Sequence, residues 1–159
     1  MNQLIWSMIL TILPVSELRG GLPLAINYAI KNNISLVPIF FLILSLNILI
    51  VFIIFFFLDF FHQKFLKIKA YNRLFNFYLE KTRKRVDKFE RKYSAYGFIA
   101  LTLFVAIPFP TTGAWTGTIL SWILGLDRKK SLIAICFGVF IASLIVLLAS
   151  LGIINLFKI

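Results

Sequence analysis

The residue types that most often carry catalysis and metal binding are scarce in this chain. Among its 159 residues there are one cysteine, one histidine and six acidic residues. The lone thiol, Cys136, cannot form an intramolecular disulfide, and no metal-ligand spacing surrounds it. The sequence has no HExxH motif and no credible pairing of a nucleophile with a base. We therefore expect neither an enzyme nor a metal or cofactor site.

Charged residues are also few, which excludes an ordinary soluble domain. They make up 14% of the chain, against about 25% in soluble domains, while hydrophobic residues make up 60%. The first cation is Arg19, so the N-terminus lacks the basic region of a secretory signal peptide. We expect an integral membrane protein in which residues 1–159 form a single domain.

Two apolar runs are long enough to cross a membrane as helices. They lie within residues 34–58 and 131–152, and about 20 apolar residues span a hydrocarbon core of ~30 Å. Each run contains a mildly polar residue, Asn47 in the first and Ser143 in the second. Such groups usually hydrogen-bond to a neighbouring helix in a membrane, so these faces are predicted to point toward protein.

Two further apolar regions, residues 1–33 and 97–126, are interrupted by proline. Pro14 and Pro108 each follow a largely apolar segment of about ten residues, which as a helix is ~15 Å long, half a bilayer. Proline ends a helix because it lacks an N–H donor and clashes with the preceding turn. Both regions are predicted to be re-entrant helical hairpins, with a kinked full span in each as the alternative.

Most of the positive charge lies between these two halves. Eleven of the 17 lysines and arginines fall within residues 64–92, and three more occupy residues 128–130. Residues 59–96 also show an amphipathic helical pattern with a basic face, typical of a segment on an anionic membrane surface. Their aromatic side chains follow the apolar seam, so membrane lipids are expected as partners and nucleic acid is not. The positive-inside rule predicts a multi-pass protein of the cell membrane with this linker cytoplasmic and both termini outside.

The two halves of the chain repeat one pattern. Aligning Pro14 with Pro108 also superposes the two long apolar runs, although the sequence identity is slight. A hairpin and one span together cross a membrane an odd number of times, so the second half must be inverted. The predicted fold is an all-α integral membrane protein of two inverted repeats, an architecture found in many secondary transporters.

The proline-broken segments, residues 14–23 and 108–117, are predicted to meet in the protein interior. Non-helical backbone at membrane depth must be buried in protein or line a watery cavity. Pro23 is expected in the first turn of the outgoing half-helix, and Thr111 or Thr112 at the N-cap of its counterpart. The predicted substrate-binding residues are Glu17, Arg19, Gly20, Gly21, Pro23, Pro108, Pro110, Thr111, Thr112, Gly113, Trp115 and Gly117.

Glu17 and Arg19 carry the predicted chemistry of this site. The N-termini of the half-helices and the guanidinium of Arg19 together suit a phosphate or a carboxylate. Glu17 would either pair with Arg19 or change its protonation and couple transport to protons. In the alternative interpretation, the two residues form a buried pair that only holds together the tips of the two hairpins, which are the proline-broken segments.

At ELRGGLP and PFPTTGAWTG the chain resembles the small membrane family labelled "putative small multi-drug export proteins". The resemblance covers nearly the whole chain, and that family looks like a distant relative of the DedA (VTT-type) superfamily, whose members have paired re-entrant hairpins. It implies transport or scrambling of lipids, including polyprenyl phosphate recycling in bacteria. DedA proteins usually have an arginine before the proline of the second motif, where this chain has Ile107 before Pro108. The arginine embedded in the membrane is here Arg19, in the first hairpin.

The leading hypothesis is a transporter, flippase or scramblase of an anionic amphiphile, such as polyprenyl phosphate or another lipid phosphate. One alternative is a proton-coupled small multidrug exporter, in which Glu17 would bind a cationic drug. The other is a non-transporting membrane scaffold. Because two spans and two hairpins form a small membrane domain, a homodimer is also expected.

Overall fold

The computed structural model of this chain describes residues 2–65, 96–109 and 112–156. Every regular element within these residues is an α-helix, which confirms the predicted all-α class. The helices are α1 (Asn2–Ile12), α2 (Glu17–Lys31), α3 (Leu36–Phe65), an unlabelled helix at Tyr96–Ala106, α5 (Ala114–Ile123) and α6 (Arg128–Leu156). Most of the predicted basic linker lies outside the described residues.

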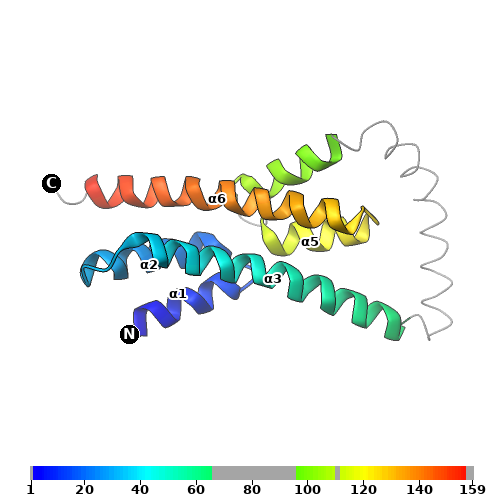
Figure 1. The fold of residues 1–159 in the computed structure, drawn as a ribbon, viewed down its shortest axis with the longest axis horizontal. Coiled ribbons are helices and arrows are strands. Elements are labelled where there is room, and N and C mark those ends of the chain that lie inside the picture. The colour runs from blue at the N-terminus through cyan, green and yellow to red at the C-terminus, as the bar shows by residue number, and fades with distance from the viewer. Residues whose placement is uncertain (1, 66–95, 110–111, 157–159) are drawn as a thin grey trace.

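Two of the helices are long enough to cross a membrane. α3 has 30 residues and α6 has 29, so each is longer than a ~30 Å hydrocarbon core at ~1.5 Å per residue. They run antiparallel along the length of the molecule (Figure 1). α3 continues past the predicted boundary at residue 59, since no proline or glycine interrupts it there. α6 begins before the predicted residue 131, because the Asp127 carboxylate caps it by accepting the Lys130 N–H at 2.9 Å.

The remaining helices form two hairpins of about half that length. In Figure 1, α1 and α2 reach the middle of the molecule from one end, and helix Tyr96–Ala106 and α5 reach it from the other. The predicted breaks are confirmed: α1 ends at Ile12, before Pro14, and helix Tyr96–Ala106 ends before Pro108. The re-entrance of these hairpins into a membrane, and the inverted-repeat relation between the halves, stay predictions.

The position of Pro23 differs from the prediction. α2 begins at Glu17, so Pro23 lies inside the helix as its seventh residue and not in its first turn. The chain reverses within residues 13–16, and Glu17 completes the reversal with a positive φ of 45°. Its N–H donates to the Leu13 carbonyl at 3.0 Å, which places Glu17 and Arg19 at the very start of the outgoing helix.

Both outgoing helices end in the same kind of turn. Asn33 after α2 and Gly125 after α5 have positive φ values of 53° and 65°. The following N–H groups, of Ile34 and Leu126, reach back into their helices, to the Ala29 carbonyl at 2.9 Å and the Ser121 carbonyl at 3.1 Å. These are the contacts of a Schellman motif, which satisfies helix-terminal carbonyl groups. In each half the long helix starts three residues after this turn.

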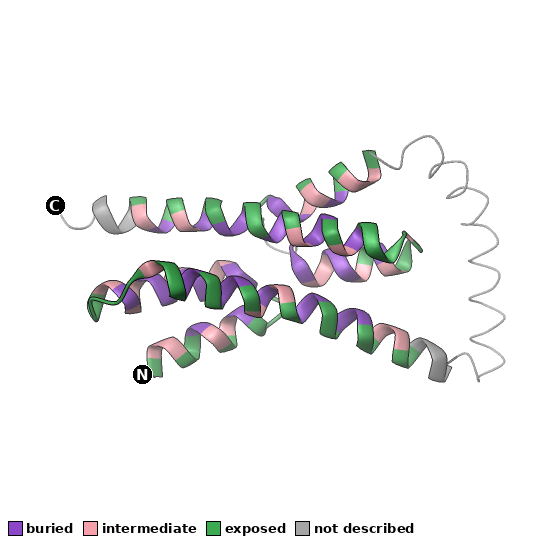
Figure 2. Ribbon diagram, viewed as in Figure 1, coloured by how far each residue is buried: buried purple, intermediate pink, exposed green. Residues whose placement is uncertain are grey.

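Small residues allow the hairpins to pack closely. Val105 of helix Tyr96–Ala106 is buried against α5 and α6, where a Cβ on Gly117 or on Gly138 would lie 2.6 Å from it. In the first hairpin, a Cβ on Gly21 would lie 2.6 Å from the Ser7 carbonyl oxygen. Small residues at helix contacts are typical of membrane proteins, because they let backbones approach. The outer faces of α3 and α6 carry the exposed apolar side chains that such a protein presents to lipid (Figure 2).

The two mildly polar residues of the long helices face protein, as predicted. Asn47 is buried and its side-chain amide donates to the Thr11 carbonyl of α1 at 3.3 Å. Ser143 is buried too, but its hydroxyl donates to the Phe140 carbonyl of its own helix at 2.6 Å. Cys136 is half-buried.

Candidate functional site

The carboxylate of Glu17 caps the helix that follows the second break. Its two oxygens accept the backbone N–H groups of Ala114, at 3.1 Å, and of Trp115, at 3.0 Å. These residues open α5, whose first N–H groups have no partner within the helix. The side chain is only 6% exposed, so the contact is shielded from solvent. A residue of the first hairpin therefore supplies the N-terminal cap of a helix in the second.

Gly113, the residue before α5, has a conformation that makes this cap possible. Its φ of 155° and ψ of −160° lie in a region that is essentially restricted to glycine. A Cβ at this position would lie 2.8 Å from the Cδ of Glu17, closer than real Cβ contacts. Gly113 is thus needed twice, for its backbone conformation and for the room that the carboxylate occupies.

The guanidinium of Arg19 binds the other side of the same break. It donates to the backbone carbonyls of Phe109 and Thr112, to the carbonyl of Ile107 at 3.3 Å, and to the Thr112 hydroxyl oxygen at 3.0 Å. Carbonyl groups at a helix C-terminus lack partners within the helix, just as N–H groups do at its start. Arg19 therefore adds donors to carbonyls that precede α5, although those of Ile107 and Phe109 also accept backbone N–H groups. Glu17 satisfies N–H groups that begin α5.

Glu17 and Arg19 bind the second break rather than one another. Among the described residues, the ion pair within 4.0 Å joins Asp59 to Arg128. The predicted contact between the two broken segments is confirmed, since both residues reach across to residues 107–115. The predicted interior position is wrong for part of each segment, because Val15 is 89% exposed and Phe109 is 64% exposed. The charges hold the tips together through backbone groups and not as a direct pair.

Trp115 returns the contact from the second hairpin to the first. Its indole Nε1–H donates to the carbonyl of Ile12, the last residue of α1, at 3.0 Å. Each tip therefore binds a carbonyl at or just beyond the end of the other hairpin's incoming helix: Arg19 binds Ile107 and Trp115 binds Ile12. Trp115 was predicted within the substrate site, and in this conformation it joins the two hairpins.

The prediction that Thr112 is the N-cap of α5 is wrong. The N-cap residue is Gly113, and the Thr112 hydroxyl lies 2.8 Å from the Ile107 carbonyl and 2.9 Å from the Phe109 carbonyl. The reason is that Glu17 already occupies the N–H groups that a threonine cap would bind. Pro110 and Thr111 lie outside the described residues.

The other predicted residues shape the hairpins rather than the polar centre. A Cβ on Gly20 would lie 2.9 Å from the Ser16 Cβ, and Gly21 and Gly117 lie at close helix contacts. Pro23 is within α2, and Pro108 follows the incoming helix of the second hairpin. The structure thus brings Glu17, Arg19, Thr112, Gly113 and Trp115 together at one centre.

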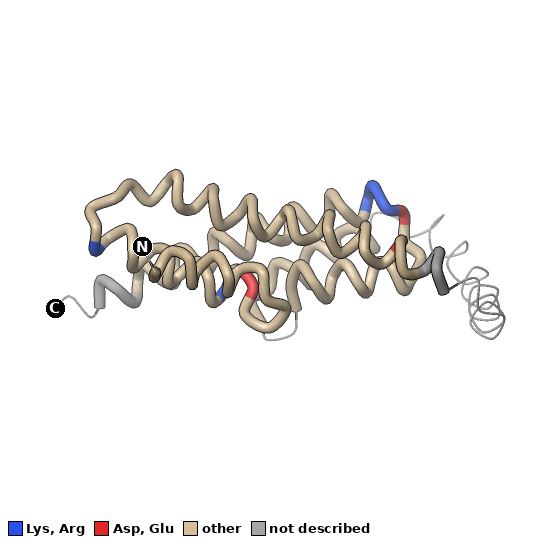
Figure 3. Tube along the Cα trace, turned by 90° about the horizontal axis from the view of Figure 1, so that it is seen from below, with Lys and Arg blue, Asp and Glu red and all other residues tan. Residues whose placement is uncertain are grey.

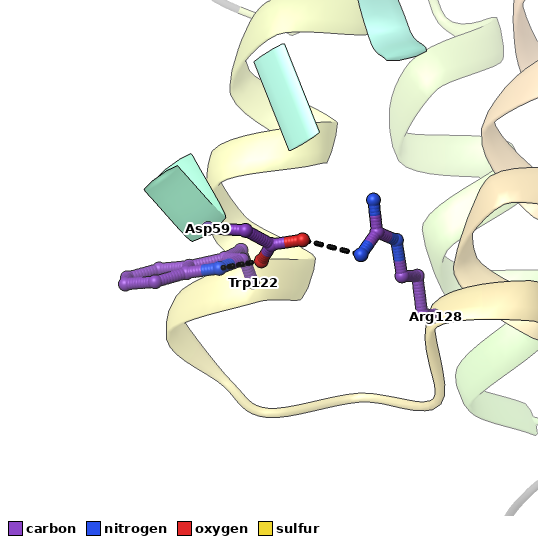
Figure 4. A network of polar contacts seen from close by, with 3 residues as sticks. All are labelled: Asp59, Trp122 and Arg128. Carbon is purple, nitrogen blue, oxygen red and sulfur yellow. Dashed lines mark hydrogen bonds and ion pairs between the residues drawn. The ribbon is translucent and has the colours of Figure 1, made fainter. Parts of the chain in front are cut away.

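The partners that sequence reasoning missed are mainly backbone groups: the N–H groups of Ala114 and Trp115 and the carbonyls of Ile12, Ile107, Phe109 and Thr112. Sequence reasoning also gave no prediction for a cluster of Asp59, Trp122 and Arg128 (Figure 4). The carboxylate of Asp59, alone at the end of an apolar run, could have indicated that cluster.

The centre lies about halfway along the molecule. Figure 3 shows the acidic and basic colours of the described chain mostly toward its two ends, with both colours also present near the middle. Glu17 and Arg19 lie in the first turn of α2. A helix N-terminus and a guanidinium are donors that suit an anion. Here the helix N-terminus binds a carboxylate of the protein itself, and the guanidinium binds backbone carbonyls of the same break. Displacement of that carboxylate would leave the N–H donors of Ala114 and Trp115 without their acceptor.

A family model described as "Putative small multi-drug export protein" matches residues 17–145, which begin at Glu17 and include the second break, all of α3 and most of α6. No curated protein and no solved structure matches the chain.

Proposed function

Because the chain belongs to the family described as "Putative small multi-drug export protein", we propose that it is a transporter whose gate is formed by the tips of its two hairpins. Its two helices of membrane-crossing length mark it as a membrane protein. The observation that carries the proposal is the capping of α5 by Glu17, because a buried charge then joins two hairpins that reach the centre from opposite ends.

In the proposed arrangement both hairpins are re-entrant and the two halves form an inverted repeat. The short helices of the hairpins and the similar turns at Asn33 and Gly125 support this. The cations of residues 128–130 support a cytoplasmic location for that end of the molecule, in the cell membrane.

The gate works by exchange of the group that caps α5. In the closed state Glu17 holds the N–H groups of Ala114 and Trp115, and Arg19 holds the carbonyls of the break. A protonated Glu17 has one fewer acceptor oxygen and no charge, so its hold on the helix N-terminus weakens. Proton uptake would thus free α5 and allow the tips to separate.

The substrate class that fits this gate is an anionic amphiphile with a phosphate or carboxylate head group. The two N–H groups of α5 already bind a carboxylate, one to each oxygen, and Arg19 lies in the same centre. A lipid phosphate such as polyprenyl phosphate offers the same oxygen acceptors and would compete with Glu17. Apolar helix faces, exposed along α3 and α6, suit its acyl or prenyl chains.

Export of cationic drugs is the second candidate, and the family description favours it. The geometry of Glu17 opposes it, because both carboxylate oxygens already accept N–H groups and a guanidinium lies beside them. A cation would have to displace α5 from Glu17 and then bind close to Arg19.

Reconstitution in liposomes tests the proposal. A fluorescent anionic phospholipid in the inner leaflet should reach an impermeant quencher outside faster with protein than without it. Arg19→Gln should lower the rate by about tenfold or more, because hydrogen bonds to charged groups contribute about 1.5–3 kcal/mol. Glu17→Gln should retain movement but abolish its dependence on a proton gradient. Lys31→Gln, which removes an exposed cation elsewhere, should behave as the wild type.

Two results would overturn parts of this proposal. Equal rates in empty and protein-containing liposomes would exclude the anionic amphiphile as substrate. Efflux of a lipophilic cationic dye that requires Glu17 and survives Arg19→Gln would establish the drug-export alternative instead.

A further inference from the structure

The short helix α5 is attached at its outer end as well as at the tip. The indole Nε1–H of Trp122, its penultimate residue, donates to the Asp59 carboxylate of α3 at 3.1 Å. Asp59 also accepts from the guanidinium of Arg128, the first residue of α6 (Figure 4). The Arg128 guanidinium carbon lies 5.5 Å from the centre of the Phe55 ring of α3. One carboxylate therefore ties together α3, the end of α5 and the start of α6.

The two attachments of α5 have the same form. At its N-terminus it donates N–H groups to Glu17, and near its C-terminus it donates an N–H to Asp59. Both acceptors are carboxylates that lie before the basic linker, whereas α5 lies after it. With ten residues, α5 is ~15 Å long, which is short enough for a rotation or shift of one end to be transmitted along the helix to the other.

We propose that Asp59 is a positioning residue of the gate: by holding Trp122 beside Arg128 it fixes the outer end of α5, and so aligns the inner end with Glu17. This inference rests on the proposed gating role of Glu17. The tip bonds are 3.0 and 3.1 Å long, ordinary lengths for N–H to oxygen bonds, and such bonds weaken steeply when their alignment is lost. A small displacement of the helix therefore weakens both of them.

The Asp59 cluster is partly exposed, which suits an attachment of α5 that can break and re-form. The Arg128 side chain is 56% exposed and that of Asp59 is 36% exposed. Exposed ion pairs add little to folding stability. Loss of Asp59 should therefore leave the helices assembled, and a strong effect at the distant tip would show positioning rather than general unfolding.

Backbone hydrogen exchange at Ala114 and Trp115 measures the tip directly and needs no transport substrate. In the full chain in lipid nanodiscs, Asp59→Leu and Trp122→Phe should each accelerate exchange of these two amides by about threefold to tenfold. Asp59→Asn, which retains an oxygen acceptor for the Trp122 indole, should exchange more slowly than Asp59→Leu. Exchange in the middle of α6 should stay at its wild-type rate in all three, which confirms the fold.

Two controls make the outcome decisive. Glu17→Ala should accelerate exchange at Ala114 and Trp115, which shows that the measurement detects an open tip. Lys129→Gln removes an exposed charge at the same end as Asp59 and should leave the exchange unchanged. The proposal would be overturned if Ala114 and Trp115 exchanged at the wild-type rate in both Asp59→Leu and Trp122→Phe while Glu17→Ala accelerated their exchange. Failure of the transport assay with accelerated exchange would instead refute the proposed function and leave the coupling of the two ends intact.

Discussion

Replacement of Gly113 by alanine tests the capping of α5 most directly. Gly113 has a φ of 155° and ψ of −160°, and an added Cβ would lie 2.8 Å from the Cδ of Glu17. The methyl group would therefore strain the backbone and also push the carboxylate away from the N–H groups of Ala114 and Trp115. Gly113→Ala should destabilise the protein through both effects.

The size of the effect follows from these two contributions. A residue held in such a backbone region costs of order 1–3 kcal/mol. Hydrogen bonds to a charged group contribute about 1.5–3 kcal/mol, and loss of the carboxylate leaves buried N–H donors unpaired. Gly113→Ala should therefore lower the free energy of unfolding by about 3–5 kcal/mol, which is large for a single methyl group.

Gly125 provides the matched control. It also has a positive φ, of 65°, but a Cβ there would meet no atom within 4 Å. Gly125→Ala should thus cost only the left-handed strain of about 1–2 kcal/mol. Both variants can be compared with the wild type by equilibrium unfolding in mixed micelles. An equal loss of stability in Gly113→Ala and Gly125→Ala would refute the close approach of Glu17 to Gly113.

Two further predictions concern contacts between the hairpins. Trp115→Phe keeps an aromatic side chain but removes the indole Nε1–H that binds the Ile12 carbonyl, so the free energy of unfolding should fall by about 1 kcal/mol, as measured in the same micelles. Gly138→Leu should cost about 1–3 kcal/mol or more, because a Cβ there already lies 2.6 Å from Val105. Gly152→Leu, in the same helix with open space around its Cβ, should change stability by less than about 0.5 kcal/mol, and an equal loss would contradict the packing described.

The helix boundaries were predictable where a local backbone effect decides them. Pro14 and Pro108 were predicted to end half-length helices, and α1 and helix Tyr96–Ala106 do end just before them. Proline acts through its own missing N–H and its own ring, so its effect can be read from the residue alone. The same reasoning failed for Pro23, because α2 starts where the tip reverses at Glu17 and continues through the proline.

The partners of the charged residues were not predictable in the same way. Glu17 and Arg19 were recognised as candidates because ionisable groups are costly in a membrane. Their actual partners are backbone groups of residues 107–115, and a backbone N–H or carbonyl leaves no mark on the amino-acid sequence. The same limit explains why Thr112, a good N-cap residue by type, does not cap α5.

The charged side chains of Glu17 and Arg19 and the broken backbone of the second hairpin supply hydrogen-bond partners to one another. A break inside a membrane protein leaves N–H and carbonyl groups without partners, and a buried charge lacks the water that would solvate it. Here the carboxylate of Glu17 accepts the first N–H groups of α5, and the guanidinium of Arg19 supplies further donors to the carbonyls of the second break. Buried ion pairs can often be replaced by apolar residues without loss of stability. That exchange should fail here, because an apolar pair would leave the helix ends of the second break unsatisfied.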